Sequence, residues 1–320
     1  MFGMIDLHLH LDGSLSIGLI ESLAKQQHIT LPEPLLPSIQ ASPRCQDLNE
    51  YLRCFDLPLL LLQTPEALRQ AVSDLIHRLD AAGLWYAEIR FAPQLHTQKH
   101  YRQEEILQGA LAGLAGAPFP VQLILCCMRG DQNEAANQET LRLAADYLGK
   151  GVCALDLAGA EGIFPTCQYA DLFAAAREAG VPFTIHAGEA AGPESIREAI
   201  RFGASRIGHG VRLREDPALL DEILARGIPL EMCPTSNLQT RAVSSLADYP
   251  LRDYLQKGLY VTVNTDNMTV SQTSLAQEYQ LLSLTPCEIH QLLSHSIRAA
   301  FLPETVKSTL QSRLKNPLEK

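Results

Sequence analysis

The sequence lacks any apolar run long enough to span a membrane, since its longest one surrounds residues 59–62 and a membrane helix needs about 20 residues. It also lacks the basic start, apolar stretch and small-residue cleavage site of a secretory signal. Its eight cysteines form no C-x-x-C pair, which argues against a cysteine zinc site. We therefore expect a cytoplasmic protein whose thiols are reduced and mostly buried.

Clustered positive charge is also missing. The 26 basic residues are scattered and are outnumbered by 36 acidic ones, which gives a formal net charge of −10. A nucleic-acid partner would favour a basic surface, so we expect neither a nucleic acid nor a membrane as partner. A small uncharged substrate fits this balance better. The sequence leaves the oligomeric state open.

The composition is that of a chain with a large core. Of its 320 residues, 46% are hydrophobic and 19% are charged, and the length is normal for an α/β barrel. No Ser/Gly linker, low-complexity tract or internal repeat divides the chain. We therefore expect a single domain over residues 1–320.

Short apolar runs alternate with longer amphipathic segments along the whole chain. The runs predict eight strands, at residues 4–8, 85–91, 121–125, 152–156, 183–186, 206–209, 229–232 and 260–264. Helical patterns between them include residues 65–82, 132–148, 194–202 and 217–226, and a glycine follows each of these four. Alternating strands and helices predict an α/β fold, a TIM-type (β/α)8 barrel. An open doubly wound sheet is the alternative, but no G-x-G-x-x-G follows the first strand.

Residues 30–64 are extra length between the first strand and its crossover helix. They hold five prolines and an apolar patch. We expect a helical cap, inserted after strand one, over one end of the barrel. A surface excursion without a function is the alternative.

Titratable residues collect at the C-terminal ends of the strands, where the active sites of such barrels lie. His8 and His10 share one face of the first strand, because side chains alternate along a strand. Later strands end in or near four more such residues: His186, Glu189, His209 and Asp266. Taken singly, each has a structural explanation, such as a hydrogen-bonding His pair or an Asp that caps a helix. Their coincidence at one end of one barrel favours a functional site.

Imidazole and carboxylate groups gathered in this way are ligands for a metal ion. They suit zinc, with iron, cobalt or manganese as substitutes. A zinc ion would lower the pKa of a bound water to about 7 and make hydroxide available at neutral pH. The residues therefore predict metal-assisted attack of hydroxide on an electrophilic carbon.

Several segments resemble the adenosine deaminase family in order and spacing. They are residues 4–14 (MIDLHLHLDGS), 186–189 (HAGE), 206–210 (RIGHG), 233–237 (CPTSN) and 264–266 (NTD), supported by 88–93 (EIRFAP) and 156–159 (DLAG). The resemblance covers nearly the whole chain, and HAGE with GHG is highly specific to this family among amidohydrolases. It implies zinc-dependent hydrolytic deamination of adenosine and deoxyadenosine, purine nucleosides, to inosine and ammonia in purine salvage.

The resemblance also implies a role for each matching residue. One zinc ion per chain would be held by His8, His10, His186 and Asp266. Glu189 would be a protonated acid that gives a proton to purine N1. His209 would orient or deprotonate the attacking water and steady the oxyanion, and Asp266 would accept a hydrogen bond from that water.

Substrate contacts follow from the same resemblance. They would come from His10, Asp12, Gly159 and Asn267. Asp12 would hold ribose hydroxyls, and the Gly159 backbone N–H would meet purine N3. Many family members carry a second Asp where Asn267 stands here, and that Asp must be protonated to donate to purine N7. Since an amide donates at any pH, we hypothesise that Asn267 keeps the N7 contact.

The implied chemistry places a demand on Glu189. Adenine C6 is a poor electrophile until a proton on N1 draws electron density from it, so Glu189 must carry a proton at neutral pH. A closed pocket of low dielectric raises a carboxyl pKa in this way. Leu52 and Phe55 fall where the family's cap contributes apolar contacts, with simple helix packing as the alternative. Ser236 and Asn237 either orient Asp266 or are ordinary turn residues.

Other functions stay open at this point. A sibling deaminase would act on adenine, an N6-substituted adenine nucleotide or another adenosine-like metabolite. Asp12 favours a sugar over a free base, and a phosphate has candidate partners in the cap region: Arg44, Arg53 and Arg102. A two-metal hydrolase is disfavoured because residues 152–157 hold no bridging Lys. A non-catalytic nucleoside-binding protein would have lost a ligand or acid, and none is lost. The cytidine-deaminase signature is absent.

Overall fold

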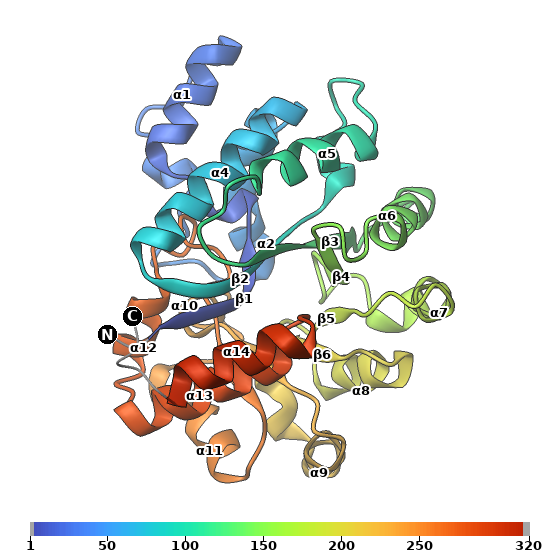
Figure 1. The fold of residues 1–320 in the computed structure, drawn as a ribbon, viewed down its shortest axis with the longest axis vertical. Coiled ribbons are helices and arrows are strands. Elements are labelled where there is room, and N and C mark those ends of the chain that lie inside the picture. Colours follow the sequence, from blue (N-terminus) through green and yellow to red (C-terminus); the bar gives the residue numbers. More distant parts are fainter. Residues whose placement is uncertain (1–2, 316–320) are drawn as a thin grey trace.

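The computed structural model describes residues 3–315, with strands at the centre of Figure 1 and helices around them. The eight strands are β1 (Met4–His10), β2 (Leu84–Phe91), β3 (Val121–Met128), β4 (Val152–Ala158), β5 (Thr184–Ala187), β6 (Arg206–His209), β7 (Leu230–Met232) and β8 (Val261–Val263). They pair in parallel and in sequence order within two four-stranded sheets, β1 to β4 and β5 to β8.

Two seams join these sheets into a closed barrel. At one seam, Leu155 of β4 bridges Phe183 just before β5, and Leu155 N donates to Pro182 O at 2.9 Å. At the other, Leu9 of β1 bridges Asp266 just after β8. The expected TIM-type (β/α)8 barrel is therefore confirmed, and the open sheet is excluded.

The outer layer consists of helices that follow the strands in Figure 1. They are α4 (Pro65–Ala81), α5 (Gln103–Gly113), α6 (Glu134–Asp146), α7 (Ala170–Glu178), α8 (Pro193–Phe202), α9 (Pro217–Arg226), α10 (Pro234–Gln239), α11 (Leu251–Gln256), α12 (Leu275–Leu281), α13 (Pro286–Ala299) and α14 (Glu304–Lys315). Gly203 and Gly227 end α8 and α9 in the left-handed region, with φ of +96° and +63°. None of the helices described is both long and apolar enough to cross a bilayer.

The strands β3 and β4 extend beyond their expected ends, to Met128 and Ala158. Their pairing continues to these two residues. Both strands finish in residues that are buried or half-buried and small or flexible, so nothing in their side chains interrupts the ladder. The extension matters because Gly159, a predicted substrate contact, follows immediately.

Charged side chains occupy part of the barrel interior. Arg206 lies between two carboxylates, with Nη2 2.6 Å from Glu88 Oε2 and Nε 2.6 Å from Glu231 Oε1. All three side chains are almost completely buried. Because buried charges are tolerated only when they are paired, this network holds the facing strands in a defined arrangement.

The insertion between β1 and α4 covers the barrel end at which β8 finishes. It contains α1 (Ile17–Gln27), α2 (Leu48–Leu52) and α3 (Asp56–Leu61). Tyr51 packs against Val270 of the segment after β8, and Tyr51 Oη lies 2.6 Å from Ser271 Oγ. The segment at residues 30–64 is thus helical in part and lies against the chain that follows Asp266.

Candidate metal centre and active site

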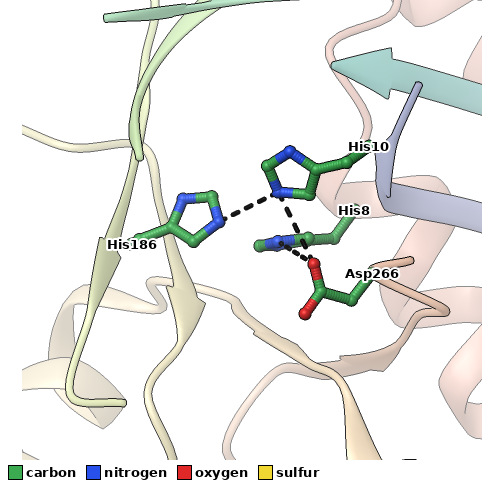
Figure 2. A group of neighbouring side chains, drawn as sticks. All are labelled: His8, His10, His186 and Asp266. Carbon is green, nitrogen blue, oxygen red and sulfur yellow. Dashed lines mark hydrogen bonds and ion pairs between the residues drawn. The ribbon is translucent and has the colours of Figure 1, made fainter. Parts of the chain in front are cut away.

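Four side chains meet where β1, β5 and β8 end, and Figure 2 shows them pointing toward one another. His8 and His10 come from β1, His186 comes from β5, and Asp266 follows β8. Each offers one nitrogen or oxygen atom, and the four atoms lie within 4.8 Å of one another. His10 Nε2 is 3.2 Å from His186 Nε2 and 3.5 Å from Asp266 Oδ1. The structure therefore brings together the four residues that the sequence predicts as ligands.

The donor set fits a metal ion. His8 Nε2 is buried and has no hydrogen-bond partner within the described part of the chain, and it lies 3.6 Å from Asp266 Oδ1. A buried polar atom without a partner costs about 1–3 kcal/mol, a cost that a bound ion would remove. Burial holds the pKa of His10 well below its usual range, so its imidazole is neutral, the form that binds metals.

Buried carboxylates orient two of these imidazoles by contacting Nδ1, the ring nitrogen that is not directed at the other predicted ligands. His8 Nδ1 is 2.8 Å from Glu231 Oε2, and His186 Nδ1 is 3.0 Å from Asp156 Oδ2. Arg90 links both carboxylates, with Nη1 2.9 Å from Asp156 Oδ2 and Nη2 2.9 Å from Glu231 Oε2. Burial alone would raise the pKa of Glu231. Arg90 helps to hold this pKa well below its usual range. Such partners fix the ring and the tautomer of a metal-binding His.

Glu189 lies in the loop after β5, beside the four predicted ligands. Burial, with the charges of Asp266 and Glu161, raises the pKa of Glu189 to about 8. Thr240 Oγ1 donates a hydrogen bond to Glu189 Oε1 at 3.0 Å. This raised pKa favours the protonated carboxyl group at neutral pH, which is the state that its predicted role needs.

His209 is the last residue of β6, and its Nε2 atom is 3.5 Å from Glu189 Oε2. Burial holds the pKa of His209 well below its usual range, so the ring is neutral. Asn237 Oδ1 accepts a hydrogen bond from Cys233 N at 3.4 Å, which turns Asn237 Nδ2 toward His209 Nδ1 at 3.0 Å. Because Nδ1 accepts, the ring proton of His209 resides on Nε2.

The two interpretations offered for Ser236 and Asn237 are both wrong. The residues are not in a turn, because they lie in α10, which begins at Pro234. Asn237 contacts His209 and Glu189, and in the described structure neither residue hydrogen-bonds to Asp266. Proline at the first position of a helix is a start signal that could have indicated α10.

A cavity of about 290 Å³ adjoins this cluster. The cap contributes Leu48, Leu52 and Phe55 to its walls, so Leu52 and Phe55 lie where the resemblance implies. The barrel contributes small side chains at strand ends, among them Ala92 and Ala158. The cavity therefore combines an apolar cap wall with a polar floor of titratable groups.

The predicted substrate residues line the same cavity. Burial raises the pKa of Asp12 to about 6. Gly159 has φ of +106°, and a Cβ there would lie 3.3 Å from Met128 Cε. Asn267 Nδ2 donates to Asp266 Oδ1 at 2.7 Å, while Asn267 Oδ1 is buried without a partner in the described structure. One amide hydrogen of Asn267 is thus used by Asp266.

The fold and these side chains define a metal-dependent hydrolase built on a (β/α)8 barrel. The family model described as adenosine deaminase matches residues 4–317. A curated adenosine deaminase of Haemophilus ducreyi is 55% identical, over 98% of this chain and 96% of its own. The chain therefore belongs to the adenosine deaminase family. It is a hydrolase that deaminates adenosine.

Two solved structures share the fold. Adenine deaminase from Arthrobacter aurescens is 29% identical with a TM-score of 0.88, and the match covers 99% of each chain. An amidohydrolase from Burkholderia ambifaria with bound Zn is 18% identical with a TM-score of 0.87, over 99% of this chain and 90% of its own. At that identity the second match shows the fold alone.

Proposed function

We propose that one zinc ion serves the deamination of adenosine and deoxyadenosine to inosine and ammonia. Its ligands would be His8, His10, His186 and Asp266. The observation that carries this proposal is His8 Nε2, which is buried without a hydrogen-bond partner among residues 3–315 and belongs to a set of three imidazoles and one carboxylate. Such a set is typical of zinc, and the Burkholderia ambifaria protein has bound Zn. When bound, the ion would supply hydroxide near neutral pH.

In this proposal Glu189 supplies the proton for purine N1. Its raised pKa keeps the proton available at neutral pH, and its burial excludes competing water. The overall balance is simple: water gives its oxygen to C6, one proton ends on N1 of inosine, and the other leaves in ammonia. Glu189 acts as the relay that delivers the first proton before C6 is attacked.

In this proposal His209 acts as a hydrogen-bond donor through its Nε2–H group. Of the roles implied by the resemblance, deprotonating the water needs a free Nε2, whereas steadying the oxyanion needs an N–H there. The hydrogen bond from Asn237 to Nδ1 supports the second role, since it leaves the proton on Nε2. His209 would thus orient the attacking oxygen and stabilise the negative charge that develops on it.

The cavity supports a nucleoside as substrate. Asp12 would hold ribose hydroxyls, the Gly159 N–H would meet N3, Asn267 would donate to N7, and His10 would contact the sugar side of the ligand. A phosphate would find little compensation, because Arg44, Arg53 and Arg102 are not among the described residues that line the cavity. Arg129 does line it, but its guanidinium already donates to Phe164 O, Thr166 Oγ1 and His186 O. Buried Asp12 would repel it as well.

An ultraviolet assay on adenosine, deoxyadenosine, adenine and AMP tests the proposal, with and without a chelator. We expect the two nucleosides to be deaminated and AMP and adenine to react at least about 100-fold more slowly, since a missing sugar or an uncompensated phosphate leaves buried polar groups unpaired. Zinc should restore activity after chelation. Deamination of AMP at the rate of adenosine would overturn the nucleoside assignment.

We further propose that residues 1–320 form one domain with a cap at about 30–64, and that the enzyme works in the cytoplasm in purine salvage. The ring of strands runs through the chain from Met4 to Val263, which supports a single domain. All eight cysteines are free, and six of them are buried, which supports a reducing compartment.

A further inference from the structure

A buried carboxylate, Glu161, holds the loop that carries Glu189. Glu161 lies two residues beyond Gly159 and is 2% exposed. Its Oε2 accepts from the backbone N–H groups of Glu189 at 3.0 Å, Ala190 at 2.7 Å and Ala191 at 3.0 Å. Its Oε1 accepts from Gly188 N at 2.7 Å. One side chain thus binds four consecutive amides of the loop between β5 and α8.

These amides belong to no strand or helix, because they lie between Ala187, the last residue of β5, and Pro193, the first of α8. Backbone N–H groups that are removed from water need an acceptor. The loop is also tightly seated, since Gly188 has φ of +71° and a Cβ there would lie 2.4 Å from Ile196 Cδ1. The position of the Glu189 backbone therefore depends on Glu161.

A chain of hydrogen bonds fixes Glu161 in turn. Ser195 Oγ donates to Glu161 Oε1 at 2.5 Å and lies 2.7 Å from Thr166 Oγ1. Arg129 Nη2 donates both to Thr166 Oγ1 at 3.0 Å and to the backbone carbonyl of His186 at 2.7 Å. The network thus hydrogen-bonds to the chain at two places: the carbonyl of His186 and the loop amides that follow it.

We propose that Glu161 is a positioning residue for deamination: it sets where the Glu189 carboxyl group meets purine N1. The inference rests on the proposed role of Glu189. It needs no contact between Glu161 and the substrate, because Glu161 acts through the backbone of the loop. A misplacement of about 1 Å at a reacting group costs on the order of 100-fold in rate.

The first test compares Glu161→Gln with the matched control Glu194→Gln. Glu194 is an exposed carboxylate in the first turn of α8, directly after this loop, and it accepts from one amide, Gly192 N, at 3.0 Å. We expect Glu161→Gln to lower kcat for adenosine by about 10- to 100-fold with unchanged metal content, since one acceptor oxygen becomes an amide NH2 group, which cannot accept from the loop N–H that it faces. Glu194→Gln should stay within about twofold. Ser195→Ala, which removes one support of Glu161, should lower kcat by a few-fold and serves as the readout if Glu161→Gln does not fold.

Two further measurements separate positioning from general damage. The inhibition constant of 1-deazaadenosine, in which a C–H replaces N1, should change by less than about twofold in Glu161→Gln, because this ligand does not use Glu189. In the Glu189→Gln background, adding Glu161→Gln should cause no further loss of kcat, because residues that act as a unit are not additive.

Weaker binding of 1-deazaadenosine, an additive double variant, or wild-type kcat in Glu161→Gln would each overturn the inference. If Glu189→Gln kept full turnover, the proposed role of Glu189 would fail first, and the inference with it. If Glu189→Gln were inactive while Glu161→Gln behaved as wild type, only the inference would fail. The two failures are therefore distinguishable.

Discussion

Arg90 joins the two carboxylates that orient His8 and His186. Removing its charge should therefore leave these carboxylates, and the two imidazoles that they hold, less firmly positioned. Its guanidinium reaches Asp156 and Glu231 at 2.9 Å each and is fully buried. We predict that Arg90→Met, which keeps much of the side-chain volume without the charge, lowers the free energy of unfolding and weakens metal binding.

The size of each effect follows from the contacts. Removing one partner of a buried ion pair costs about 3–5 kcal/mol, because the other charge is left uncompensated. Glu231 would keep Arg206 at 2.6 Å, while Asp156 would keep His186 at 3.0 Å, so we expect a loss near the lower limit, about 3 kcal/mol. Loss of the groups that orient a metal-binding His weakens metal binding by about 10- to 100-fold. Arg90→Met leaves Asp156 and Glu231 in place and removes only the charge that links them, so we expect the lower value, about 10-fold.

Urea denaturation of the metal-free protein measures the first effect, and competition with a chromophoric chelator measures the second. Arg201→Met is the control, since Arg201 pairs with Glu198 on the surface and its side chain is 62% exposed. The control should cost less than about 1 kcal/mol and leave the metal dissociation constant unchanged. A dissociation constant of Arg90→Met within threefold of wild type would refute the reasoning, even if stability fell.

Three shorter predictions concern catalysis. Glu189→Gln should lower kcat by at least about 100-fold while the protein keeps its metal, because Gln has the shape of Glu but gives no proton; metal analysis that showed an empty site would make Glu189 a ligand instead. The value of kcat/KM should fall as pH rises through about 8, since the raised pKa of Glu189 means that its protonated form is lost there; a rate profile that stayed flat well above pH 8 would contradict this. Asn267→Ala should lower kcat/KM for adenosine about tenfold, because it removes the amide that donates to Asp266 Oδ1 and is proposed to donate to N7; an unchanged value would exclude the N7 contact.

The residues at the strand ends could be predicted from the sequence because position and chemistry coincide there. An apolar run that stops at His-Leu-His or at His-Ala-Gly-Glu marks both the strand and the titratable group that it delivers. A parallel barrel then brings such ends to one rim, whatever their separation along the chain. His8 and His186 are 178 positions apart in sequence, yet their ring centroids lie 4.5 Å apart.

The groups behind the ligands could not be predicted in the same way. A charged residue inside an apolar strand, such as Arg90 or Glu231, indicates only that a buried charge needs a partner. The pattern does not say which of the other strands supplies that partner. Glu161 was missed for a different reason: four of its partners are backbone amides, which leave no trace in the sequence of the loop that they belong to.

Asp266 shows why the metal site and the barrel cannot be separated. Its backbone closes the seam between β8 and β1, since its N–H donates to His8 O at 2.8 Å and its carbonyl accepts from His10 N at 2.7 Å. Its φ of +59° lies in the left-handed region, which ends the extended strand and costs a non-glycine residue conformational energy. These two hydrogen bonds lie on either side of Leu9 and join Asp266 to both histidines of β1, so closing the barrel also sets the spacing between the carboxylate and both imidazoles. The ligand geometry is therefore fixed by strand pairing, which a loop of the same sequence could not provide.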